Sequence, residues 1–206
     1  MANIPTSGLN SLSNLDSGDL INISEDLGGG SFESRKMTAG NFDMVHGTRY
    51  YGVSATDPSS PSPQNGDEYY NSAIGIKMYY DGTRSKWLSV ETETVHFGRD
   101  GSTLAGSYYR GIDGQALSAT NGIIALENGT VIGIGYTRDD TDSATFEVTA
   151  GGTLITGAVL ASTSLSGKTK NLNSNFSEDD ILAVRNQSGG NSTTNVEGWV
   201  RLKWRI

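Results

Sequence analysis

The residue types that carry most metal and nucleophilic chemistry are scarce in this chain. Its 206 residues include two histidines, His46 and His96, and no cysteine. A tetrahedral zinc site draws mainly on histidine and cysteine, and thiol catalysis requires cysteine, so neither is expected. The sequence also lacks the motifs Gly-x-Ser-x-Gly, His-Glu-x-x-His and Gly-x-x-x-x-Gly-Lys-Ser/Thr. No recognisable active site follows from these residue types.

Two acidic runs are the remaining candidates for chemistry: Asp139-Asp140-Thr141-Asp142 and Glu178-Asp179-Asp180. Clustered carboxylates can bind calcium, and a pair of them can act as acid and base in glycoside hydrolysis. Such runs are more often solvated turns. We therefore expect no catalytic residue, no cofactor and no metal, while calcium at Asp139, Asp140 and Asp142 stays an open alternative.

Charge and hydropathy limit the partners of the chain. The formal net charge is −8, which argues against binding the nucleic-acid backbone. The basic residues Arg201, Lys203 and Arg205 alternate along one strand face and do not form a groove. No apolar run approaches the roughly 20 residues that span a bilayer, and Met1–Pro5 lacks the features of a signal peptide. We expect synthesis in a cytoplasm and no membrane or nucleic-acid partner.

The stretch from Pro63 to Trp87 is the most informative element. Gly66-Asp67 and Asp81-Gly82 are turn dipeptides, and the runs after them are rich in strand-forming aromatic residues. Eight of the nine tyrosines stand in adjacent pairs, and adjacent strand residues point to opposite faces. A module of about fifty residues buries too little surface to cover two aromatic faces. The predicted subunit interface therefore comprises Tyr69, Tyr70, Tyr79, Tyr80, Trp87, Tyr108 and Tyr109; the alternative leaves one ring of each pair half exposed.

Composition divides the chain into three parts. Residues 1–45 carry irregularly spaced apolar residues and the break Gly28–Ser31, so we interpret them as an arm that docks onto a partner, with a ragged first strand as the alternative. Residues 46–95 form the aromatic β-hairpin module, which includes a proline-rich connector at 57–63. Residues 96–206 form the last domain, with a hinge at 96–106. The predicted docking residues of the arm are Leu9, Leu12, Leu15, Leu20, Ile21 and Ile23.

Residues 107–206 show the two-residue period of an antiparallel sandwich or barrel. Asn128-Gly129 and Gly151-Gly152 are predicted turns. Ile132, Ile134 and Tyr136 are expected on one face, and Gly133 and Gly135 on the other, where missing side chains permit close backbone approach or a tight contact between subunits. In the last strand we expect Val196, Gly198, Val200, Leu202, Trp204 and Ile206 to be buried, and Trp199, Arg201, Lys203 and Arg205 to face the other way.

The combination of these motifs resembles bacteriophage fibre and other virion proteins. The pattern Pro63-x-x-Gly66-Asp67-x-Tyr69-x-Asn71, then Tyr80-x-Gly82 and Trp87, is similar to a cassette of those proteins. The run Gly129–Ile132, the run Phe146–Val148 and the pattern Phe176-x-x-x-Asp180-x-Leu182-x-Val184 resemble their jelly-roll heads, with Asp179 where glycine is expected. Asp19–Ile23 and Ser34–Thr38 resemble their N-terminal segment. The resemblance implies a homotrimer with an N-terminal attachment region and a distal jelly-roll knob.

The sequence thus predicts an all-β structural virion protein, a short trimeric head fibre or capsid-decorating protein. Its expected location is the virion surface, and its expected partners are other copies of itself and capsid or other virion proteins. A host-surface glycan is a further candidate partner. The alternatives are a short tail fibre that binds a receptor, a carbohydrate-binding module that uses Trp199 or Tyr108, and a depolymerase that uses Asp140 or Asp180.

Overall fold

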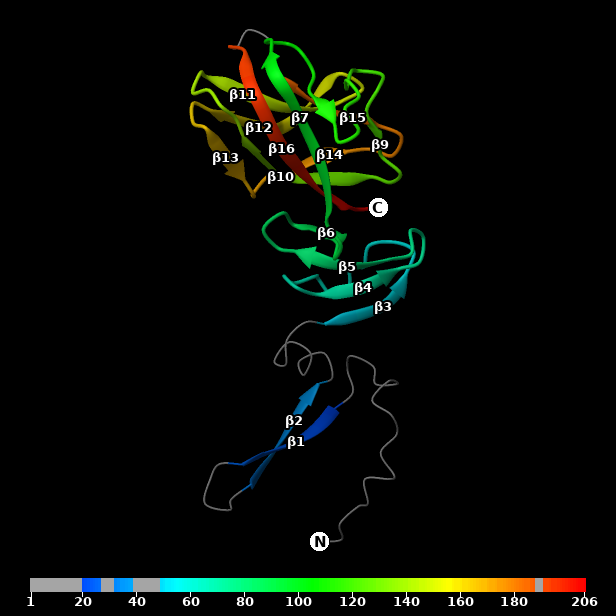
Figure 1. Cartoon of the computed structure of the whole chain (residues 1–206). Coiled ribbons are helices and arrows are strands. Elements are labelled where there is room, and N and C mark those ends of the chain that lie inside the picture. Colours follow the sequence, from blue (N-terminus) through cyan, green and yellow to red (C-terminus); the bar gives the residue numbers. More distant parts are fainter. Residues whose placement is uncertain (1–19, 27–31, 39–48, 188–190) are drawn as a thin grey trace. The chain divides into compact units, whose positions relative to one another are not determined.

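The computed structural model describes residues 20–26, 32–38, 49–187 and 191–206 (Figure 1). The chain forms two compact units, residues 1–50 and Tyr51–Ile206. The described residues contain strands and no helix, and the pairing of β1 with β2 and the pairings among β4 to β16 are antiparallel. The predicted all-β class is confirmed.

In the first unit, β1 (Leu20–Asp26) pairs with β2 (Phe32–Thr38), and Leu20 lies opposite Thr38. Leu20, Ile21 and Ile23, three of the predicted docking residues, thus lie in a strand. Leu9, Leu12 and Leu15 lie outside the described residues. A docking role for Leu20, Ile21 and Ile23 stays a prediction.

A small four-stranded sheet follows, in the order β3-β4-β5-β6. Its strands are β3 (Tyr50–Ser54), β4 (Glu68–Asn71), β5 (Ile76–Asp81) and β6 (Lys86–Ser89). Both predicted turns are present. Gly66 adopts a φ of 91° before β4, and the Asp81 carboxylate accepts the amides of Thr83 (3.0 Å) and Arg84 (3.1 Å) after β5.

Two further sheets contain the remaining strands. The larger has the order β13-β10-β16-β7-β8, with β14 also paired to β10, and the smaller has the order β12-β11-β15-β9. Their bounds are β7 (Glu93–Thr103), β8 (Arg110–Gly111), β9 (Ile123–Ile124), β10 (Gly129–Thr137), β11 (Ala144–Ala150), β12 (Thr153–Ser162), β13 (Ser166–Thr169), β14 (Ser174–Phe176), β15 (Ile181–Asn186) and β16 (Thr193–Trp204).

The two larger sheets pack face to face around one apolar core (Figure 1). Buried residues of both sheets contribute to it, among them Val131, Ile134, Tyr136, Val200 and Leu202 from the first and Phe146, Val148, Ile155, Leu182 and Val184 from the second. The alternation predicted for the last strand is confirmed at Val196, Gly198, Val200 and Leu202, which are all buried in β16. We call this pair of sheets the sandwich.

Two predictions on strand β10 are wrong. Gly129 is not in a turn but begins β10, where a Cβ would lie 2.1 Å from the Phe176 ring. A register shift between Val131 and Gly133 then turns Val131 into the core and leaves Ile132 half-buried. The expected close approach is present, because a Cβ on Gly135 would lie 2.6 Å from the ring of Trp199 in the same chain.

The hinge predicted at 96–106 is also wrong. Residues 93–103 are strand β7, which pairs along most of its length with β16. Glycines in this segment suggested a flexible link, but Gly98 lies where a Cβ would meet the Val196 carbonyl oxygen at 2.5 Å. Its missing side chain therefore permits close strand packing.

In the turn before β15, Asp179 occupies the position where the sequence pattern leads us to expect glycine. Asp179 has a φ of 65°, a left-handed conformation that an L residue adopts at a cost, and its amide donates to the Ala125 carbonyl at 2.9 Å. We expect Asp179→Gly to raise the free energy of unfolding by about 0.5–1 kcal/mol, measured by urea denaturation. The control is Glu178→Gly at the exposed neighbour, which should not stabilise. A destabilised Asp179→Gly protein would contradict the argument.

Candidate binding surface

An aromatic cluster fills one side of the small sheet. The Trp87 ring meets three tyrosine rings edge to face, with centroid distances of 5.5 Å to Tyr51, 4.9 Å to Tyr69 and 5.4 Å to Tyr80. Ile206, after strand β16, packs against the same cluster. The cluster is therefore a small core shared between the sheet and the C-terminal residues.

The proline-rich segment hydrogen-bonds to this cluster. Tyr69 Oη donates to Asp57 Oδ1 (2.7 Å), Trp87 Nε1 donates to the Pro58 carbonyl (3.0 Å), and Tyr51 Oη donates to the Pro61 carbonyl (2.6 Å). Burial and the bond to Asp57 raise the pKa of Tyr69 well above its ordinary value, so its hydroxyl remains a donor. Cover for the aromatic face thus comes from the chain itself.

The residues predicted at a subunit interface divide into three groups. Tyr69, Trp87 and Tyr109 are buried within the chain, which leaves their rings no surface for another subunit. The half-buried group is Tyr79, Tyr80 and Tyr108, whereas Tyr70 is 40% exposed. Of the seven residues, Tyr70 offers the most surface to a partner.

A buried lysine of β16 connects the sandwich to the small sheet. Lys203 Nζ donates to the carbonyls of Ser89 (2.6 Å) and Val90 (2.8 Å), and lies 4.7 Å from the centroid of the Tyr79 ring. Burial, with a smaller effect of nearby Arg201, lowers the pKa of Lys203. The backbone amide of Trp204 also donates to Ser89 Oγ at 2.9 Å. We call these contacts, with those of Arg84 and Lys86 below, the joint.

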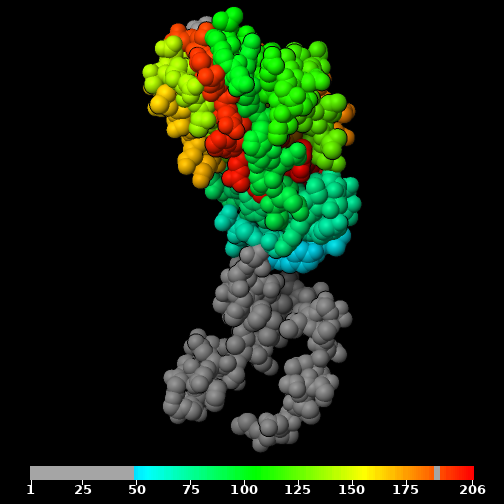
Figure 2. Space-filling view, in the orientation of Figure 1, coloured from blue at the N-terminus to red at the C-terminus, as the bar shows by residue number. Residues whose placement is uncertain are grey.

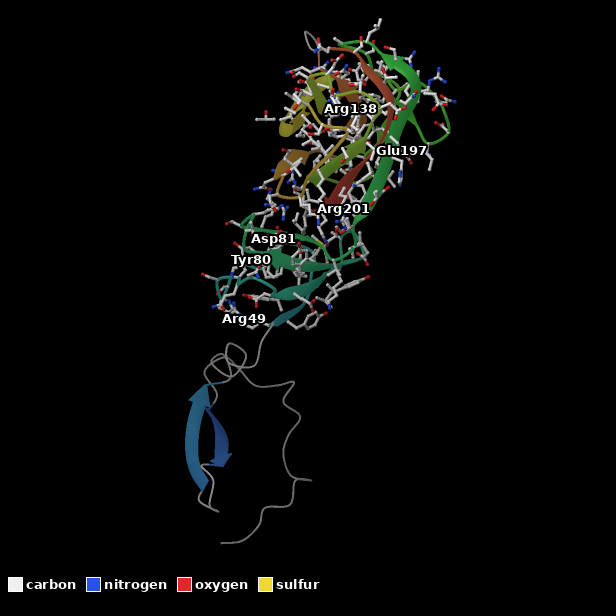
Figure 3. All side chains as sticks on the ribbon, turned by 60° about the vertical axis from the view of Figure 1, so that its left-hand side comes forward. Arg49, Tyr80, Asp81, Arg138, Glu197 and Arg201 are labelled. Carbon is white, nitrogen blue, oxygen red and sulfur yellow. The ribbon has the colours of Figure 1, made fainter. Side chains whose placement is uncertain are left out.

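The turn between β5 and β6 forms the second half of the joint. Arg84 donates to the carbonyls of Lys170 (2.9 Å) and Leu172 (2.7 Å), and pairs at 2.5 Å with Asp81. Figure 3 labels Asp81 in the small sheet. Burial alone would raise the pKa of Asp81, but the bonds from Arg84 outweigh it and lower that pKa. Lys86 Nζ adds a bond to Asn175 Oδ1 at 2.7 Å. The two parts are thus tied by side chains from both.

The acidic runs have structural partners. Buried Arg138 pairs with Asp140 at 3.0 Å and also donates to the Asp142 carbonyl, while Asp139 accepts the side-chain amide of Asn195 at 2.7 Å. In the second run, Asp180 Oδ2 accepts the Ser177 amide at 2.7 Å. Within the described residues no three His, Cys, Asp or Glu side chains converge to hold a metal ion. The carboxylates of Asp139, Asp140 and Asp180 thus have protein partners.

A polar groove of about 820 Å³ follows the outer edge of β7 and the turn after β8. Two arginines, Arg99 and Arg110, and two carboxylates, Asp100 and Glu197, line it together with His96. Arg99, Asp100 and Glu197 form no ion pair elsewhere in the described residues. These charges are therefore available to a partner.

Four exposed aliphatic side chains lie in the segment that contains β8 and β9: Ile112 (87% exposed), Ile123 (36%), Ile124 (59%) and Leu126 (75%). Ile112 also lines the polar groove. A second groove of about 320 Å³ is lined in part by Val95, Ile112, Leu117 and Ile123. We call this face of the sandwich, with the polar groove, the open side.

Comparison of the chain with protein-family models, with curated proteins and with solved structures found no match. In the described part of the chain, no helix is long and apolar enough to cross a membrane. The interpretation of the molecule therefore depends on its own geometry.

Sequence reasoning missed the residues of the open side. Strands β8 and β9 have two residues each, too few to show a period, so the hydrophobic pattern could not single out Ile112 and Ile124. A usable signal was the run of apolar residues among the turn glycines Gly114 and Gly122. Trp199, a predicted sugar platform, lies half-buried against Gly135, which leaves less of its ring accessible.

Proposed function

We propose that the chain is a structural virion protein, a short trimeric head fibre or capsid-decorating protein. Its N-terminal residues attach to capsid or other virion proteins, and its sandwich, a jelly-roll knob, is exposed. The observation that carries the proposal is the construction of Tyr51–Ile206: the joint ties a small sheet to a sandwich whose open side exposes Ile112, Ile124 and Leu126. Exposed apolar patches of this kind favour protein association.

The strand order supports the jelly-roll assignment. After β8 in the larger sheet the chain enters the smaller sheet at β9, returns at β10, and crosses again to β11, β13 and β15 before ending in β16. Repeated crossing between two antiparallel sheets is typical of jelly rolls, which form virion and lectin domains. The cassette from Gly66 to Trp87, on which the resemblance to virion proteins rests, folds back on itself through β4, β5 and β6.

The roles of the polar residues also favour structure over catalysis. Asp140 and Asp180, the residues considered for a depolymerase, are engaged by Arg138 and by the Ser177 amide.

Imaging of purified particles tests this function. Particles made with the full chain should show surface density that is absent from particles made without it. A chain lacking residues 1–45 should fold but fail to decorate. Density on the tail, and not the head, would assign a tail fibre, and particles unchanged by loss of the chain would contradict a structural virion role.

A further inference from the structure

The open side has three properties that together point to one kind of partner. The first is its apolar content. Four exposed aliphatic side chains lie within residues 112–126, a segment that crosses from the edge of the larger sheet to the edge of the smaller sheet. In Figure 2 the green strand β7 lies between the red strand β16 and the yellow-green atoms of this segment. Burial of such side chains gives about 1.5–3 kcal/mol each.

The second property is an open strand edge. β8 pairs only with Phe97 and Gly98, so most of the outer edge of β7 has no strand partner among the described residues. β9 likewise pairs with only Ile181 and Leu182 of β15. Unpaired strand edges accept another chain readily, and proteins normally shorten, charge or cover them. Here β7 is long and only partly covered.

The third property is charge balance. The chain carries a net charge of −8, so two copies repel each other over most of their surface. In the polar groove, two arginines, Arg99 and Arg110, balance two carboxylates, Asp100 and Glu197. A surface with equal numbers of both signs can complement the same kind of surface on another copy, whereas a strongly charged partner would satisfy only half of these groups.

We propose that the open side is the surface through which copies of this chain associate. The apolar residues Ile112, Ile123, Ile124 and Leu126 form the centre of the contact, and the charges of the polar groove form its rim. The inference rests on the homotrimer of the proposed function and locates its subunit contact on the sandwich, away from the paired tyrosines of the small sheet.

The test compares two variants by light scattering coupled to size-exclusion chromatography. Ile112→Glu combined with Ile124→Glu places charges in the centre of the contact and should weaken association at least about 100-fold, leaving a monomer of 21.8 kDa. Leu165→Glu is the matched control, since Leu165 is 53% exposed in the turn between β12 and β13. The control should keep the wild-type mass. Circular dichroism checks that both variants fold.

Hydrogen exchange on the wild-type chain provides a second measurement that requires no variant. Amides of β7 and of residues 110–126 should gain protection when the protein is concentrated from monomer to trimer. A trimer that persists in the double variant, or that leaves these amides unprotected, overturns the inference but not the proposed function. A wild-type chain that stays monomeric overturns the inference, and particle imaging then decides the proposed function separately.

Discussion

Removal of Trp204–Ile206 is expected to abolish the cooperative unfolding of Tyr51–Ile206, or to lower its free energy of unfolding by at least about 5 kcal/mol. These residues contact both parts of the unit. The Trp204 ring meets Phe176 edge to face at 6.0 Å, Arg205 Nε donates to the Gly129 carbonyl at 3.2 Å, and Ile206 packs against the Trp87 cluster. Their loss opens the sandwich core and the aromatic core together.

Single substitutions separate these contributions. Trp204→Ala should cost about 2–4 kcal/mol and Ile206→Ala about 1–2 kcal/mol, because both side chains are only partly buried. Leu165→Ala, at an exposed turn, should change stability by less than about 0.5 kcal/mol. Thermal unfolding followed by circular dichroism provides the comparison. A truncated protein with the wild-type melting curve would show that these contacts contribute nothing.

Where the side-chain period was long and regular, the sequence was sufficient to predict structure. β16 extends over 12 residues, and its alternation of Val196, Gly198, Val200 and Leu202 with polar residues predicted the buried face correctly. The glycine pair at Gly151-Gly152 predicted the turn between β11 and β12, and both residues have positive φ. In β10 the period misled, because a single bulge after Val131 reverses the faces.

The cover of the aromatic cluster could not be read from side-chain types. Trp87 donates a hydrogen bond to the Pro58 carbonyl, and Tyr51 donates one to the Pro61 carbonyl. Because every residue has a backbone carbonyl, the sequence does not indicate which of them will accept these bonds. Only the folded path of the proline-rich segment brings these acceptors to the rings. The sequence thus predicted the need for cover correctly but not its source in the same chain.

The same limit applies to Lys203. Its alternation with Leu202 and Trp204 predicted that it would point away from the sandwich core, which it does. No residue pattern indicated that the small sheet would lie on that face and supply carbonyl acceptors from Ser89 and Val90. The Lys203 side chain is therefore only 8% exposed, although lysine side chains are rarely buried.

Lys203→Ala is expected to loosen the joint, at a cost of about 2–4 kcal/mol. It removes the ammonium group that bonds three successive carbonyls, those of Ser89, Val90 and Glu91, and the cation that lies over Tyr79. Because the core of the sandwich is untouched, hydrogen exchange should accelerate in β4, β5 and β6 while β10 and β11 keep their protection. Lys203→Met retains most of the stem, so its difference from Lys203→Ala measures the packing share.

Lys77→Ala, in β5 of the small sheet, is the matched control for the loss of a lysine. Lys77 pairs with Glu68 at 2.6 Å, but the two side chains are 47% and 31% exposed, and such pairs contribute at most about 1 kcal/mol. If Lys203→Ala and Lys77→Ala accelerate exchange equally, the buried amine does not hold the joint. If only Lys203→Ala does, this one side chain accounts for much of the rigidity of the contact between the small sheet and the sandwich. Particles decorated with that variant should then show blurred density for the sandwich, while the number of attached copies stays unchanged.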